Sequence, residues 1–192
     1  MTVSDSGSNT WTNPVIAAGV TTDGGVSAVY YHYFVTAPGS MTVSVAYAGW
    51  GSGGGGRQVA VLVLIGAASN QAAGATAKLL ATTGTTGTVS ITTTTTGSWV
   101  FGASSDVISN DSWTANASTQ ADNNYSDSTD LVTLVAWDAL ALTTTPGATT
   151  LGGTWGVSTE SNQCAFEVLP KTAFIATQPL ILTAAAVRKA YY

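Results

Sequence analysis

The chain has 192 residues, of which 45% are hydrophobic and only 8% are charged, and its formal net charge is −5. A chain of this length can bury a substantial core without disulfides or metal ions, and its six Trp, seven Tyr and four Phe argue against disorder. The negative charge excludes duplex nucleic acid as a partner of the body, and no run approaches the roughly 18 apolar residues of a membrane helix.

The first strands are predicted between residues 9 and 47. Residues 9–12 form a short strand, and residues 26–35 form a ten-residue run rich in Val and aromatic side chains, which favour strands. Residues 41–47 alternate, with Met41, Val43, Val45 and Tyr47 facing inward and Thr42 and Ser44 facing outward. We expect residues 26–35 and 41–47 to pair as a hairpin through a Pro-Gly turn.

The most apolar stretch is residues 57–65, which contains seven consecutive apolar residues from Val59 to Ile65. Glycines precede it at residues 51–56 and follow it at Gly66. A short run of this kind is typical of a strand that is covered on both faces. We therefore expect it at the centre of the sandwich, and we expect Val61→Asp or Val63→Asp to unfold the protein.

The middle of the chain is read as strands separated by loops. Residues 67–81 are predicted as a surface loop with at most one helical turn, because Asn70 and Gly74 interrupt the alanine-rich pattern. Strands are predicted at residues 89–94, 98–104 and 131–142. The acidic segment 106–130 holds five of the eight aspartates and is predicted as loop, apart from a strand at residues 112–118.

Two further strands, at residues 149–156 and 163–169, complete the predicted sheet structure, and Glu160 is placed in a polar turn between them. The spacing of eight to ten strands without helical crossovers predicts an all-β fold. We expect an antiparallel, jelly-roll-like β-sandwich over residues 1–170, followed by a C-terminal strand or arm over residues 171–192.

The charge is divided unevenly between these two parts. Residues 1–170 carry two bases and ten acids, a charge of −8, whereas the last 22 residues carry three bases and no acid. Because unlike charges attract, this basic and apolar segment is expected to dock on an acidic surface, either its own body or a neighbour's. The residues predicted to bind a partner are Lys171, Arg188, Lys189, Tyr191 and Tyr192.

Catalytic and metal-binding signatures are weak. The single histidine, His32, lies in an aromatic strand and is predicted to be structural, and the single cysteine, Cys164, is predicted to be buried and inert. The aspartates of segment 106–130 match no calcium-binding loop, and Glu160 and Glu167 are not expected to form a catalytic pair. We therefore expect no enzyme activity, no cofactor and no metal site.

Several segments together resemble a known group of proteins. Residues 3–12, 29–39, 59–65, 98–103 and 165–170 are similar, in their order and strand patterns, to β-sandwich modules in structural proteins of tailed bacteriophages. Related modules occur in secreted bacterial surface proteins. The resemblance covers most of residues 3–170 and implies a virion role, as a capsid decoration protein or a minor tail protein. It transfers no catalytic residues and does not include the segment from Lys171 onward.

Two hypotheses of function follow. The first is a non-enzymatic virion protein that forms homo-oligomers and binds the major capsid protein or a tail scaffold. Its low charge makes the surface easy to desolvate, and the N-terminus lacks a signal peptide, so synthesis in the host cytoplasm is expected. The alternative is a carbohydrate-binding module in which exposed aromatic residues and segment 106–130 bind host-surface glycans. Neither hypothesis requires nucleic acid or a membrane as a partner.

Overall fold

The computed structural model describes residues 1–18, 26–36, 38–46, 60–61, 63–71, 74–106, 111–128 and 132–171. In these residues every strand pair is antiparallel and no α-helix occurs, so the expected all-β, sandwich-like fold is confirmed. Nor do they contain a helix that is long and apolar enough to cross a membrane. The strands are β1 (Thr2–Asp5), β2 (Thr12–Ala18), β3 (Val26–Tyr31), β4 (Val43–Ala46), β5 (Thr76–Thr92), β6 (Trp99–Asp106), β7 (Trp113–Ala115), β8 (Thr119–Asp127), β9 (Val132–Ala139) and β10 (Ala148–Val168).

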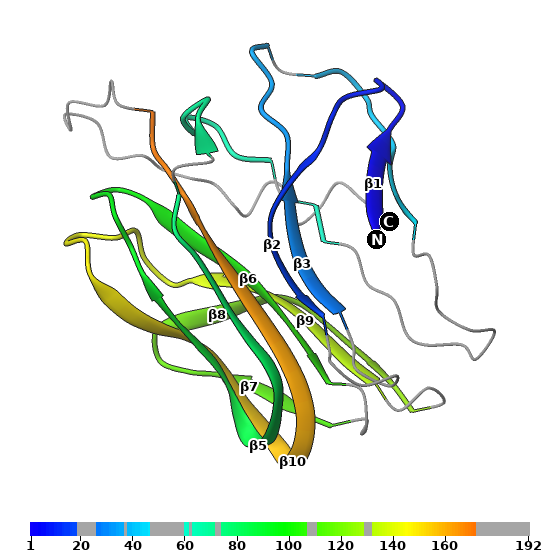
Figure 1. Ribbon diagram of the computed structural model, residues 1–192, viewed down its shortest axis with the longest axis vertical. Helices are drawn as coiled ribbons and strands as arrows, with labels where there is room; N and C mark the ends of the chain where they lie inside the picture. Colours follow the sequence, from blue (N-terminus) through cyan, green and yellow to red (C-terminus); the bar gives the residue numbers. More distant parts are fainter. Residues whose placement is uncertain are drawn as a thin grey trace.

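The long strand β10 organises the main sheet. The strand order is β5-β10-β6-β9-β8, and β7 pairs with β10 outside this path (Figure 1). On one edge β10 pairs with β5 along most of its length. On the other edge its first part pairs with β7 and its second part pairs with β6. One strand therefore connects all the parts of the sheet.

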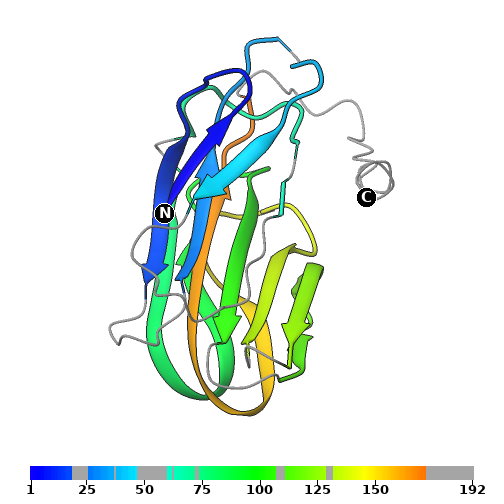
Figure 2. The ribbon, with the colours of Figure 1, turned by 90° about the vertical axis from the view of Figure 1, so that its right-hand side faces the viewer.

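A bend in the β5–β10 pair folds the sheet over itself. The register of this pair shifts between Thr154 and Thr159, where the regular ladder is interrupted. Gly84 and Gly152 lie near this bend with φ angles of 144° and 111°, which glycine adopts without steric cost. Strands commonly turn the corner between two packed layers through such irregularities. Figure 2 shows β5 and β10 curving together at the lower end of the molecule.

The main core lies inside this fold. Its buried side chains come from both halves of the bent sheet and are Val89, Ile91, Val100, Trp113, Val135, Trp137, Ala139, Leu151, Trp155 and Ala165. Trp137 on β9 lies against Gly102 on β6, where an added Cβ would be 2.2 Å from its ring carbon Cζ2. Its indole Nε1 donates to the Ser104 hydroxyl at 2.9 Å. One of the three tryptophans of this core therefore depends on a position that has no side chain.

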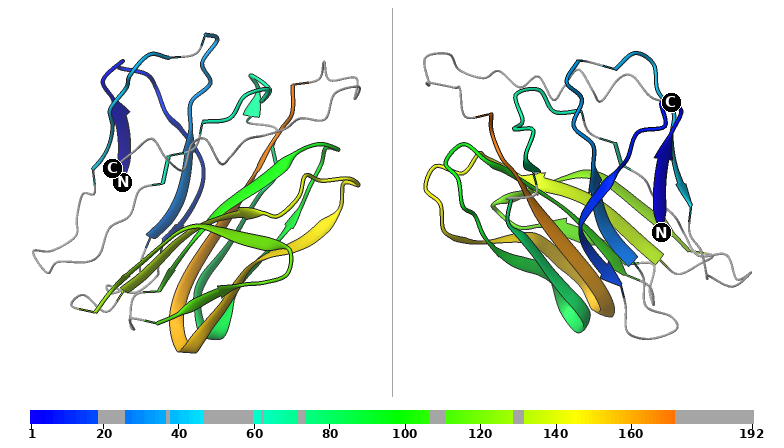
Figure 3. Two further views of the ribbon diagram at one scale, coloured as in Figure 1. Left: turned by 180° about the vertical axis from the view of Figure 1, so that it is seen from behind. Right: turned by 45° about the horizontal axis from the view of Figure 1, so that its top comes forward.

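The pair β2–β3 forms a second layer on the opposite face of the main sheet. Val15 and Ala17 of β2 pack in a second buried cluster with Cys164 and Phe166 of β10. The ring of Tyr31 on β3 stacks on Phe166, with centroids 5.5 Å apart. Figure 3 shows the blue strands of this pair next to the orange half of β10.

The pairing of the N-terminal strands differs from the prediction. β3 pairs with β2, and β4 pairs with β1, so the hairpin predicted from residues 26–35 and 41–47 is wrong. β2 brings Val15 and Ala17 to a buried cluster, and this burial favours it over the half-exposed β4 as the partner of β3. The alternation predicted for residues 41–47 is confirmed as far as Ser44 and Val45, because Met41, Val43 and Val45 are half-buried and Thr42 and Ser44 are exposed; Tyr47 lies outside the described residues.

Three predicted boundaries are also wrong. β5 begins at Thr76, inside the segment predicted as a loop, and β8 occupies nine residues of the predicted acidic loop. Residues 148–168 form one strand, so Glu160 lies in β10 and not in a turn. These Thr-, Ser- and Asn-rich stretches have weak strand patterns, and they become strands because long neighbours pair with them.

The predicted central strand, residues 57–65, is not the centre of the fold. Its described residues, 60–61 and 63–65, belong to no strand. Val61, Val63 and Ile65 are 49%, 62% and 86% exposed. The other residues of the run lie outside the described part of the chain. An apolar run can be buried within its own chain or stay exposed, where another molecule can contact it. Here β10 occupies the central position in the main sheet, and the described residues of the run stay exposed.

Candidate docking pocket

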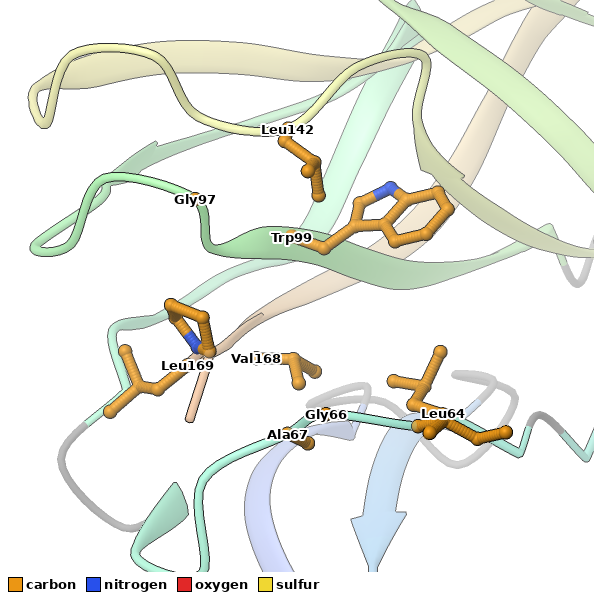
Figure 4. Close-up of a pocket in the computed structure, with 10 residues that line it drawn as sticks. Leu64, Gly66, Ala67, Gly97, Trp99, Leu142, Val168 and Leu169 are labelled. Carbon is orange, nitrogen blue, oxygen red and sulfur yellow. The ribbon is translucent and has the colours of Figure 1, made fainter. Parts of the chain in front are cut away.

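A small apolar pocket lies where the C-terminal segment begins, just after the end of β10. Residues 64–67 form one wall, and Gly97, Trp99 and Leu142 form the facing wall, with residues 168–170 between them (Figure 4). Its volume is about 60 Å³, far below the roughly 300–1,000 Å³ of typical small-molecule sites. The pocket therefore has room for a small apolar group and not for a complete substrate.

The first wall is held to the end of β10 by a short β-bridge between Ala67 and Pro170. The Ala68 N–H donates to the Leu169 carbonyl at 2.9 Å, and the Lys171 N–H donates to the Gly66 carbonyl at 2.7 Å. A buried glutamine strengthens this bridge. The Gln71 amide donates to the Leu169 carbonyl and accepts from the Leu169 N–H at 2.8 Å.

The facing wall is built from the start of β6 and the segment after β9. Trp99 is fixed by its indole N–H, which donates to the Ala139 carbonyl at 2.8 Å. The Gly97 N–H donates to the Thr143 carbonyl at 2.7 Å, and the Thr143 N–H donates to the Ser98 carbonyl at 2.9 Å. Backbone hydrogen bonds therefore join the two segments of this wall.

Glu167 stabilises this wall from within. Its side chain has no exposed surface, and its carboxylate accepts hydrogen bonds from the backbone of Ala75, Thr94 and Thr95 and from the hydroxyls of Thr94 and Ser98. Burial alone raises the pKa of this carboxyl group, but the donors at Ser98, Ala75 and Thr94 outweigh it and hold the pKa below its usual value. Glu167 is thus a structural anchor for the turn between β5 and β6.

Exposed aliphatic side chains line the pocket or lie close to its lining in the chain. Ile65 and Leu142 line it and are exposed, and Val63 and Leu140 lie next to them in the chain with 62% and 61% of their surface exposed. Single exposed apolar residues are ordinary, but a group of them around an apolar pocket marks a contact surface. The arrangement can bind a complementary apolar surface, and the lining that the structure describes holds no ionisable side chain.

A second hollow borders the first. It has a volume of about 440 Å³ and lies between the segment after β9 and the turn before β8. Hydroxyl groups are frequent in its lining and come from Thr93, Ser118, Thr143, Thr144, Thr145 and Thr149. Its volume falls within the range of ligand sites, and its chemistry suits an uncharged polar ligand.

Of the five residues predicted to bind a partner, the structure describes only Lys171. Its side chain is exposed, and its backbone N–H belongs to the bridge that forms the first wall of the pocket. Arg188, Lys189, Tyr191 and Tyr192 lie outside the described residues, as does the rest of the predicted arm. The predicted basic site and the apolar pocket therefore meet at Lys171.

The residues predicted to be structural take structural positions. Cys164 has no exposed surface, and burial raises the pKa of its thiol to about 12. His32 lies with Nδ1 2.8 Å from the Thr10 carbonyl, which can only accept, and its ring packs edge-on against Phe34. Trp113, Trp137 and Trp155 are buried in the main core and so cannot form an exposed platform for sugars.

The acidic segment does not gather its carboxylates into a metal site in the part that the structure describes. Within those residues, no group of three or more His, Cys, Asp or Glu could hold a metal ion. Asp106 is fully buried and accepts from the Thr159 hydroxyl, whereas Asp111 is part-exposed. The side chains of Asp127 and Asp130 lie outside the description.

Neither the pocket nor the anchoring role of Glu167 is predicted from the sequence. Pocket residues come from four distant parts of the chain, so no local motif marks them. The one available signal was the apolar run before Gly66, which was interpreted as core. Comparison of the chain with known protein families, curated protein sequences and solved structures finds no match.

Proposed function

We propose that this protein is a non-enzymatic structural component of a virus particle, a capsid decoration protein or a minor tail protein, that acts by packing against copies of itself and a viral scaffold. The proposal joins the virion role implied by the sequence resemblance to a contact surface in the fold. The observation that carries it is the apolar pocket together with four exposed aliphatic side chains at or near it. These side chains, which we call the rim, are Val63, Ile65, Leu140 and Leu142.

The rim supports an assembly role because its side chains gain free energy only when another surface covers them. Burying an aliphatic side chain of this size contributes about 1.5–3 kcal/mol. Val63, Ile65 and Leu140 are each more than half exposed. Covering all three side chains with a partner therefore supplies a large share of the binding free energy of a stable contact. The centre of that contact would hold no charged group.

The low charge of the chain supports the same role. Only 8% of the residues are charged, and the ten acids of the chain lie within residues 1–170. Thr, Ser and Asn lose less hydration free energy than ions when a neighbour covers them. The desolvation cost of packing copies closely together is therefore small. The basic residues that begin at Lys171 have a charge opposite to that of residues 1–170.

The test is whether the protein is a stoichiometric part of a particle. Particles made from the genome that carries the coding sequence are purified and analysed by quantitative mass spectrometry. We expect a constant copy number per particle, and we expect purified protein to rebind particles that lack it. Recovery only in the soluble fraction, without rebinding, would contradict the proposal. The variant Val157→Asp, altered at an exposed site on the bend of β10, is the control for rebinding.

A second candidate function, glycan binding, is favoured by the hydroxyl-lined hollow next to the pocket. Its volume of about 440 Å³ suits one or two sugar units. A glycan array followed by calorimetric titration tests this function, with Thr143→Val and Thr145→Val as variants that remove hydroxyls from the lining. Binding that both variants weaken would support it, and an absence of binding to every glycan would exclude it.

A further inference from the structure

We propose that the hydroxyl-lined hollow binds a neutral sugar unit that carries a methyl group, and that this methyl group enters the hollow first. The methyl group belongs to a deoxy sugar or to an N-acetylated sugar. The inference rests on the second candidate function, glycan binding, and names the class of sugar. Its basis is the way in which aliphatic and hydroxyl-bearing side chains are divided between the bottom of the hollow and its opening.

Strand ends bring much of the lining together. Thr93 directly follows β5, Val100 lies near the start of β6, Ala139 is the last residue of β9 and Thr149 lies near the start of β10. The first part of β10 belongs to one half of the bent sheet, whereas β6 and β9 belong to the other half. The hollow therefore lies between the two halves and adjoins the main core, as ligand sites do in the mouths of β-barrels.

The most deeply buried part of the lining, which we call the floor, is aliphatic. It consists of Val100, Ala139 and Leu151, which are 2%, 7% and 2% exposed and belong to the main core. A methyl group that reaches the floor exchanges water for aliphatic neighbours, which is favourable. A hydroxyl group there loses its hydration, and these three side chains cannot form a hydrogen bond with it. The floor therefore favours a methyl group over a hydroxymethyl group.

The opening of the hollow, which we call the mouth, carries hydroxyl groups. The exposed side chains of Ser118, Thr144 and Thr145 lie there, and each hydroxyl can both donate and accept a hydrogen bond. The chain next to the mouth is held in place, because the Thr93 hydroxyl donates to the Gly147 carbonyl at 3.1 Å and accepts from the Gly147 N–H at 3.2 Å. The hydroxyls of a sugar ring therefore find partners at the mouth while its methyl group reaches the floor.

The charge of the protein favours a neutral sugar over an acidic one. Residues 1–170 carry two bases and ten acids, a charge of −8, which repels an anion. The side chains of the described lining are aliphatic or carry hydroxyl groups, so none of them forms an ion pair with a carboxylate. An acidic sugar would therefore lose hydration on binding without gaining an ion pair in this part of the hollow.

Matched sugar pairs test the inference in the full-length protein. A glycan array shows which sugars bind, and calorimetric titration then compares L-fucose with L-galactose, L-rhamnose with L-mannose, and N-acetyl-D-glucosamine with D-glucose. The first member of each pair carries the methyl group. We expect it to bind about tenfold or more tightly in at least one pair, which corresponds to about 1.4 kcal/mol. The pair that shows this difference distinguishes a deoxy sugar from an N-acetylated sugar.

Variants of the floor and the mouth separate the two kinds of contact. Val100→Thr keeps the shape of the side chain but places a hydroxyl on the floor, and Ala139→Ser makes a similar change at a second position. We expect each to lower the preference for the methyl-bearing sugar by about threefold or more. Thr145→Val, at the mouth, should weaken both members of a pair and leave the preference unchanged. Val157→Thr, at an exposed site on the bend of β10, is the control, and circular dichroism checks the fold of every variant.

The outcomes distinguish this inference from the function on which it rests. Equal affinities within every pair, or binding only of sugars that lack a methyl group, would overturn the inference and leave glycan binding in place. A preference that persists unchanged in a folded floor variant would also overturn it. An absence of binding to every glycan would overturn the inference and the second candidate function together. The particle test of the virion role is unaffected by any of these results.

Discussion

The Ser98 hydroxyl donates a hydrogen bond of 2.7 Å to Oε1 of Glu167. This contact joins the residue before β6 to the end of β10, 69 residues away in the chain. Four further donors from residues 75, 94 and 95 converge on the same carboxylate. A single buried anion therefore holds the turn between β5 and β6, and the residue before β5, to the end of β10 beside the pocket.

Glu167→Gln is expected to destabilise the protein by about 2 kcal/mol, because hydrogen bonds to a charged group contribute roughly 1.5–3 kcal/mol. In addition, the amide NH₂ group of glutamine would face the N–H and O–H groups that donate to the carboxylate. Urea unfolding at neutral pH, followed by circular dichroism, measures the free energy of unfolding. The matched control is Ser90→Ala, which removes an exposed hydroxyl from β5. A variant as stable as the wild type would show that the carboxylate is not an anchor.

Stability should fall in acid, and Glu167 should contribute to the fall. Its pKa is lower in the folded state than the usual value of 4.5. The unfolded chain therefore binds the proton first, so stability is present above pH 4.5 and is lost as the pH falls through the folded-state pKa. Urea unfolding at several pH values between neutral and acid should give a shallower dependence for Glu167→Gln than for the wild type. Parallel curves would contradict this assignment.

Gly102→Ala should destabilise the core. The added Cβ would lie 2.2 Å from Cζ2 of Trp137 and 2.5 Å from the Cys164 carbonyl oxygen, which are both closer than any real contact. Overpacking of this kind costs about 1–3 kcal/mol or more. Gly39→Ala is the control, because nothing lies within 4 Å of its Cβ position. The measurement is the urea midpoint, with tryptophan fluorescence as a second probe, and equal midpoints for the two variants would refute the packing argument.

Cys164 should resist thiol reagents in the folded protein. Burial excludes the reagent, and a pKa raised to about 12 leaves almost no thiolate at pH 8. Reaction with a chromogenic disulfide should be slow in buffer and fast in concentrated urea. Rapid labelling under native conditions would mean that the layer formed by β2 and β3 opens readily.

Ile65→Asp should weaken self-association without unfolding the protein. The side chain is 86% exposed, so it contributes little to the core, but a charge there must be desolvated in any contact that covers the rim. We expect the dissociation constant, measured by sedimentation, to rise by about tenfold or more, which corresponds to about 1.4 kcal/mol. Val157→Asp, at a comparably exposed site, should have little effect. Unfolding of Ile65→Asp would restore the original interpretation of this run as core.

The sequence predicted the positions of several strands well where the pattern is strong. The alternation of residues 41–46, the apolar run within β9 and the buried pattern of Cys164 and Phe166 all appear in the structure. These features depend on the two-residue period of a strand, which is a local property of the chain. The buried state of Cys164 could be predicted for the same reason.

The partners of those strands could not be predicted. β3 pairs with β2 and not with β4, because only the pair β2–β3 brings an apolar face to the outer side of the main sheet. β5 and β8 are strands because β10 and β9 pair with them, although their own sequences are rich in Thr, Ser and Asn. Strand pairing joins distant residues, and a single sequence carries little information about it.

By itself, the amino-acid sequence determined that this protein is all-β, weakly charged and acidic over residues 1–170, because composition and strand periodicity follow directly from the residues present. Only the tertiary structure decided which apolar run lies inside. Residues 163–167 are buried in β10, whereas Val61, Val63 and Ile65 are exposed. The exposed run is the more apolar of the two, because Gln163 and Glu167 interrupt the buried one. Residues 163–167 are buried because β5 and β6 pair with the two edges of β10 and layers pack on both faces of this part of the sheet.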